Sequence, residues 1–187
     1  MNLSMTFKYA DAKLETKKGL NRFAWDLKQK GAWNDKKSRS FKNGPLVLPG
    51  LYTVRLTAGK ETLEQTFEVL VDPRLEKEGV NTVTIQEQLV FENKVISLLT
   101  EARKFQAKVE SEIKTSKNAD KKTELEKVLK ELKNEEGAYP QQMLVAQISY
   151  LSYIVGGADK VPGNEEVERL KDLQQQFNSV KNKVKLN

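Results

Sequence analysis

The chain has 187 residues, of which 38% are hydrophobic and 31% are charged, and it contains neither cysteine nor histidine. Those absences exclude disulfides, catalysis by thiolate or histidine, and the usual protein ligands of zinc, iron and copper. The formal net charge is +6, and the first 60 positions hold 13 basic against 4 acidic residues, so this part could meet an anionic polymer or could carry a lysine-rich solubilising surface.

Two N-terminal stretches alternate apolar and polar residues, as β-strands with one buried face do. The first covers residues 3–9, and the second covers residues 21–27, where Phe23, Trp25 and Leu27 share one face. We expect Trp25 to pack between two sheets, because a large aromatic side chain in mid-strand usually lies in the core of a sandwich.

The segment from 28 to 43, KQKGAWNDKKSRSFKN, interrupts the alternation and mixes basic with aromatic residues. Positive charge beside stacking planes is what binding of a glycan or of single-stranded nucleic acid requires. The candidate ligand-binding residues are Trp33, Lys36, Lys37, Arg39 and Phe41. The alternative, which we favour, is a mobile or interface-packed loop without a ligand. We do not expect nucleic acid as a partner.

Residues 44–75 predict a β-hairpin. Pro49-Gly50 is a turn dipeptide, and period-two alternation follows over 52–57 and again over 66–71. Asp72-Pro73 ends the second strand, because proline cannot donate to a ladder. A lone hairpin is marginal in water, so we expect further strands to cover it.

From Thr82, a plausible N-cap, apolar residues recur every three or four positions, which predicts a helix of more than about 30 residues, or about 45–50 Å. A second helical path covers residues 120–155 and is interrupted near 137–140 by Gly-Ala-Tyr-Pro. Asn164 is expected to cap a last helix. The short connections favour an antiparallel bundle within one chain over a dimerising coiled coil.

The predicted fold is therefore α+β with the two classes segregated along the chain. Residues 1–75 would form an Ig-like antiparallel β-sandwich, and residues 76–187 an antiparallel three-path helical bundle with a break near 137–140. Only about five strands are visible where seven are usual, which suggests that the sandwich lacks its first strands.

Six stretches together resemble the C-terminal region of exported bacterial proteins that carry a sortilin-type, sialidase-like β-propeller and are often labelled glycosyl hydrolases. The stretches are GLNRFAWDL (19–27), GP (44–45), PGLYTVRL (49–56), DPRL (72–75), PQQMLVAQISYL (140–151) and ADKVPG (158–163). The resemblance implies an Ig-like sandwich and a helical segment that follow a propeller. It also implies export to the periplasm, envelope or medium, although the N-terminus shown has no signal-peptide pattern. We expect the chain to be the C-terminal part of such a protein.

The residues and the resemblance favour a non-catalytic structural and interaction module, with the propeller of the parent polypeptide or another protein as its partner. The alternative is a glycan- or anion-binding module that uses the segment 28–43. A glycoside hydrolase ranks last, because Asp26 and Asp72 suit turn and hinge positions and any family activity would lie in a propeller. We predict no catalytic residue, no metal site, no cofactor and no membrane span.

Overall fold

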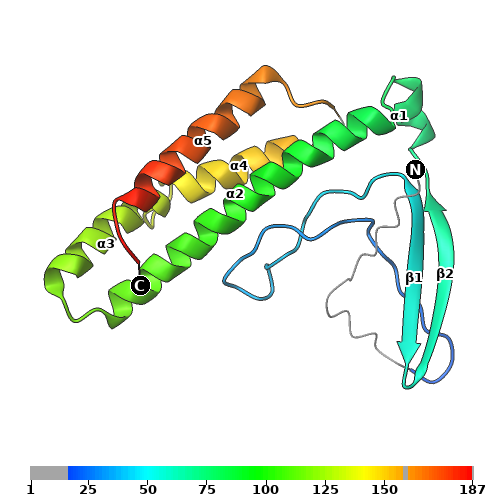
Figure 1. The fold of residues 1–187 in the computed structure, drawn as a ribbon, viewed down its shortest axis with the longest axis horizontal. Coiled ribbons are helices and arrows are strands. Elements are labelled where there is room, and N and C mark those ends of the chain that lie inside the picture. Colours follow the sequence, from blue (N-terminus) through cyan, green and yellow to red (C-terminus); the bar gives the residue numbers. More distant parts are fainter. Residues whose placement is uncertain (1–16, 158–159, 187) are drawn as a thin grey trace.

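The computed structural model describes residues 17–157 and 160–186. The elements are β1 (Gly50–Ala58), β2 (Glu61–Val69), α1 (Pro73–Lys77), α2 (Thr82–Thr115), α3 (Ala119–Leu132), α4 (Leu144–Val155) and α5 (Asn164–Asn182). Figure 1 shows α2 to α5 lying lengthwise against one another, while the β1–β2 hairpin stands crosswise beside the N-terminal end of α2. The molecule therefore has a helical body and a hairpin that projects from one end of it.

The hairpin is a regular antiparallel pair of nine-residue strands, in which Tyr52 faces Phe67 and Leu56 faces Leu63. A two-residue turn, Gly59-Lys60, joins the strands, and Gly59 has φ 63°. A positive φ at the first turn residue is the geometry that glycine favours in a tight hairpin, because its twist matches that of the strands. The predicted hairpin is confirmed.

The helical body is held by a continuous apolar core to which α2, α3, α4 and α5 all contribute. Phe105 of α2 meets Phe177 of α5 edge to face, with 5.9 Å between ring centroids. The long first helix is present as α2, and the return path is divided into α3 and α4 by residues 133–143, which include the predicted break. The helical part of the chain thus fits the expected bundle.

The helix ends differ from the predicted caps by one residue. The N-cap of α2 is Asn81, whose side-chain oxygen accepts from the backbone N–H groups of Val83 and Thr84, and Thr82 is the first helical residue. The N-cap of α5 is Gly163, and Asn164 lies inside the helix. The side-chain oxygen of an asparagine can accept from the N–H groups two and three residues ahead when the asparagine backbone is extended. Asn81 has an extended backbone, whereas Asn164 is already helical.

The predicted Ig-like β-sandwich is wrong. Within the described residues there is one sheet, of two strands, and a pair of strands cannot form two packed layers. Residues 21–27 form no strand, and near them the backbone makes a single bridge between Lys28 and Leu46. Leu27 has φ 58°, which no strand residue adopts. The strand predicted over 3–9 lies outside the described residues.

Trp25 explains why the alternation over 21–27 was misleading. Its ring packs edge-on against Tyr52 and Phe67, with ring centroids 5.6 and 6.2 Å apart. The side chain of Trp25 therefore packs on the hairpin, although its backbone does not pair with either strand. Alternation reports which side chains face an apolar surface, and an irregular segment lying on that surface gives the same pattern as a strand.

We predict that Phe177→Ala lowers the free energy of unfolding by about 3–5 kcal/mol, since a fully buried ring leaves a cavity that the helices cannot close. Urea denaturation followed by helical circular dichroism measures the change. Tyr139→Ala is the control, because Tyr139 is fully exposed and its removal should alter stability by less than about 0.5 kcal/mol. Equal stability of the two variants would contradict the described core.

Candidate interaction surfaces

Residues 28–47 form a folded loop that doubles back on itself. The N–H of Gly31 donates to the carbonyl of Phe41 at 3.0 Å, and the N–H of Phe41 donates to the carbonyl of Ala32 at 3.0 Å. A Cβ atom at Gly31 or Gly44 would collide with the opposing backbone, so only glycine permits the two arms to approach so closely. The segment is therefore an ordered structure.

The loop is fastened to the helical body at Trp33. The backbone N–H of Trp33 donates to Thr100 Oγ1 at 3.1 Å, and Arg103 Nη1 donates to the Trp33 carbonyl at 3.3 Å. Arg103 Nη2 also donates to Ser149 Oγ of α4 at 3.4 Å, so one guanidinium joins the loop to two helices. Burial lowers the pKa of Arg103, and the charge of Asp35 partly offsets this effect.

The candidate ligand-binding residues are spread over this loop and differ in exposure. Trp33 is half-buried against the helical body, whereas Lys36, Lys37 and Arg39 are exposed in the turn that follows. Phe41 is exposed, and the Lys30 ammonium lies 5.6 Å from the centre of its ring. The partial burial of Trp33 agrees with a loop that packs against the helices. Glycan or anion binding by the exposed cations stays a prediction.

An aromatic cluster, defined as Trp25, Tyr52 and Phe67, covers the base of one face of the hairpin. The Tyr52 hydroxyl donates to the Leu48 carbonyl at 2.6 Å, and Trp25 Nε1 donates to the Lys28 carbonyl at 3.3 Å. The rings of Tyr52 and Phe67 stack with centroids 6.0 Å apart. Among the residues that the structure describes, these contacts attach the hairpin to the preceding segment at one end.

The rest of that face exposes several apolar side chains to solvent, and it also carries Gln65 opposite Val54 and Glu61 beside the turn. Val54, Leu56 and Leu63 are exposed to 52%, 48% and 69%, and Phe67 keeps 37% of its surface accessible despite the cluster. Cross-strand pairing puts all four on the same side as Tyr52, because directly opposed residues share a face. We call these four residues the apolar face. Sequence reasoning predicted Val54, Leu56 and Phe67 as strand residues but placed them inside a sandwich, and its return strand, over 66–71, did not include Leu63.

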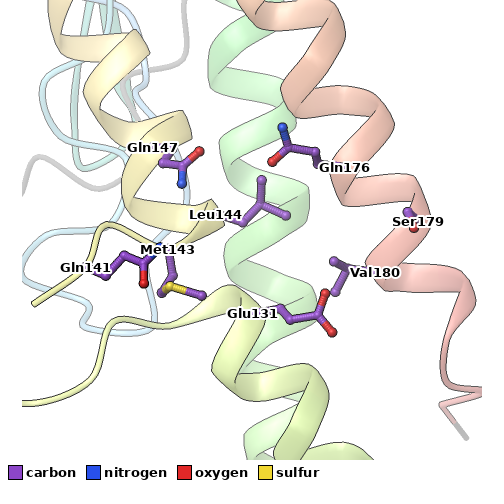
Figure 2. A pocket seen from close by; sticks show the side chains of 8 residues that line it. All are labelled: Glu131, Gln141, Met143, Leu144, Gln147, Gln176, Ser179 and Val180. Atoms are coloured by element: carbon purple, nitrogen blue, oxygen red, sulfur yellow. The ribbon is translucent and has the colours of Figure 1, made fainter.

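Two cavities lie along the helical body, and Gln147 lines both. Figure 2 shows the first, of about 280 Å³, where Glu131, Gln176 and Ser179 surround an apolar floor that includes Leu144 and Val180. The second has a volume of about 560 Å³ and is lined by Gln142, Gln147, Tyr150, Leu151, Ile154 and Arg169.

These cavities contain a single carboxylate among their lining residues, that of Glu131, and it is bound to the Lys183 ammonium at 2.7 and 2.8 Å. Gln147 accepts from Arg169 Nη2 at 2.7 Å and donates to the Gln142 carbonyl at 2.6 Å. Glycoside hydrolysis by the common route needs two carboxylates facing the scissile bond. Neither cavity supplies that pair.

Asp26 and Asp72, the two carboxylates considered from the sequence, make local hydrogen bonds of the kind expected for turns and hinges. Asp26 accepts from the Lys28 N–H at 3.1 Å. Asp72 is the N-cap of α1, where it accepts from the Arg74 N–H at 2.9 Å and is held by the Arg74 guanidinium. Hydrogen bonds from the Arg74 side chain and backbone lower the pKa of Asp72 to about 2. A general acid at neutral pH requires the opposite shift.

In the described part of the chain, no group of three or more acidic residues is placed to hold a metal ion. None of the helices in residues 17–157 and 160–186 combines the length and the apolar content that a membrane crossing requires.

Compared with family models, curated proteins and solved structures, the chain gave no match to any of them. The assignment of function consequently depends on the surfaces described above.

We predict that the Asp72 carboxylate titrates near pH 2 and that Arg74→Met raises its midpoint toward 3.8. Because the folded-state pKa is depressed, the stabilising effect of the charged carboxylate is present above about pH 4 and is lost as the pH falls toward 2. An NMR titration of the side-chain carboxyl carbon measures both midpoints. Unchanged titration in the variant would show that Arg74 does not hold this carboxylate.

Proposed function

We propose that the chain is a non-catalytic interaction module that binds a protein partner through the apolar face of its hairpin. The observation that carries the proposal is the exposure of Val54, Leu56 and Leu63 along a regular nine-residue ladder. Exposed apolar patches on soluble proteins commonly mark interaction sites, and an uncovered hairpin is marginally stable in water. Covering this face would favour both the hairpin and the complex.

The position of the hairpin supports the same proposal. It stands away from α2 to α5 and is attached through the aromatic cluster and α1 (Figure 1). The helical body closes its own core without any strand residue. A partner can therefore dock on the apolar face without disturbing the helices.

The partner that fits the resemblance is a β-propeller of an exported protein, in the same polypeptide or in another one. The proposal accordingly includes export of the chain. Each propeller blade is a small β-sheet, and a second sheet can pack face to face on the apolar face of the hairpin. The chain would then serve as a rigid docking element, and any catalysis would belong to the propeller.

We predict that replacing Val54, Leu56 and Leu63 with threonine weakens the partner complex by at least about tenfold, because three apolar contacts are lost while strand propensity is retained. The measurement is the amount of partner that is chemically cross-linked to the tagged chain in source cells and identified by mass spectrometry.

The matched control replaces Tyr150 and Tyr153 with threonine, which removes exposed apolar surface from α4 instead. The control should retain the complex, and both variants should keep the helical circular dichroism of the parent. An unchanged complex in the hairpin variant would refute the proposal.

Anion or glycan binding is the second candidate, and the exposure of Lys36, Lys37 and Arg39 in one turn favours it. We predict that replacing all three with glutamine shortens retention on immobilised dextran sulfate, with the largest effect at low salt. Replacing Lys122, Lys127 and Lys130 on α3 with glutamine is the matched control for loss of three surface charges. Equal retention of both variants would eliminate this candidate.

A further inference from the structure

The outer edge of β2 is open along its length. The strand pairs with β1 alone, and no other backbone hydrogen bond joins it to the described residues. Every side chain from residue 61 to residue 68 is exposed. An edge of this kind offers unpaired N–H and C=O groups to another strand.

The hairpin turn determines which β2 residues offer these groups. In a two-residue hairpin the pair that flanks the turn, here Ala58 and Glu61, is hydrogen-bonded, and bonded and non-bonded pairs then alternate. The N–H and C=O groups that point outward therefore belong to Thr62, Glu64, Thr66 and Glu68. Consistent with this, the side-chain amide of Gln65 donates to the Thr66 carbonyl at 3.2 Å.

Apart from its glutamates, the β2 edge lacks the features that usually prevent strand pairing. Its sequence, ETLEQTFEV, contains no proline, no glycine and no lysine, and its ladder with β1 runs without a bulge. Natural edge strands are commonly protected by such residues or by a covering segment.

The charge of β2 indicates the kind of strand that fits. Its three charged residues are Glu61, Glu64 and Glu68, and all are acidic. Glu64 is paired with Arg55 at 2.5 Å, whereas Glu61 and Glu68 form no salt bridge with the part of the chain that the structure describes. A second copy would bring six carboxylates onto one pair of strands, so self-pairing is disfavoured and a basic strand is favoured.

We propose that the outer edge of β2 binds an extended segment of a partner protein in which lysine or arginine alternates with apolar residues. The segment would add a third strand, with its basic side chains beside Glu64 and Glu68 and its apolar side chains beside Leu63 and Phe67, extending the apolar face. The backbone bonds supply affinity and the alternating side chains supply selectivity. This inference deepens the proposed function and rests on it.

The test uses the full chain and three nine-residue peptides: one with alternating lysine and valine, one with alternating glutamate and valine, and one with the first composition in two blocks. We expect the lysine–valine peptide to slow hydrogen exchange of the outward amides of Thr62, Glu64, Thr66 and Glu68 by at least about tenfold. The other two peptides should leave these amides unchanged.

A charge variant tests the electrostatic part without threatening the fold. Replacing Glu64 and Glu68, which share the face where the basic side chains would lie, with glutamine should weaken binding of the lysine–valine peptide about fivefold at low salt, as expected for two exposed ion pairs. The same change at Glu124 and Glu126, two exposed glutamates of α3, is the matched control and should have no effect.

The inference is overturned if none of the peptides slows exchange, if all three slow it equally, or if protection falls on the β1 amides instead. Its failure can be told apart from failure of the proposed function. If the charge variant of β2 retains the cellular complex and the apolar-face variant loses it, the edge inference fails while the proposed function stands. If the peptide protects β2 but the apolar-face variant keeps the complex, the proposed function fails and the edge chemistry stands.

Discussion

The rest of the structure depends on the apolar stripe along α2. Its buried residues extend from Gln88 to Val109, and α3, α4 and α5 each pack against this one helix. The buried amide of Gln88 donates to the carbonyl of Val155 at the end of α4, which fixes one end of the contact. Because this one helix contacts all the others, they are arranged around it, and it also provides the surface on which the loop 28–47 lies.

Arg103 extends that organisation to the N-terminal part of the chain. Its guanidinium bonds to the Trp33 carbonyl and to Ser149 Oγ, so the loop, α2 and α4 meet at one half-buried charge. A guanidinium suits this role because its donors point in several fixed directions and its charge persists despite partial burial. The cost is a desolvated cation, which the nearby Asp35 partly compensates.

The hairpin is in a different situation, because its own side chains cannot complete a core. The aromatic cluster covers one end of the apolar face, but Val54, Leu56 and Leu63 stay exposed, and the outer edge of β2 has no backbone partner in the described residues. The helical body buries its apolar stripes in one core. The hairpin, in contrast, leaves apolar side chains exposed and the edge groups of β2 without a backbone partner in the described residues. That difference is the physical basis for assigning interaction to the hairpin.

Prediction from the sequence succeeded where the signal was local and repeated. The apolar ladder of α2 spans many turns, so no single residue decides it, and Gly59 with the flanking alternation was sufficient for the hairpin. The helix caps shifted by one residue, because Asn81 and Thr82 are both good capping residues and only the backbone angles distinguish them.

What the sequence by itself determined is the presence of the hairpin, the long helices, the break between α3 and α4, and the absence of any thiol or imidazole chemistry. The tertiary structure alone decided that residues 21–27 do not join a sheet, that Trp33 is fastened to α2, and which side of the hairpin stays exposed. The reason is that period and turn chemistry act between near neighbours in the chain. Whether a strand is paired and covered depends on segments that are distant in the sequence. The alternating pattern of the strand is the same whether or not those segments pack against it.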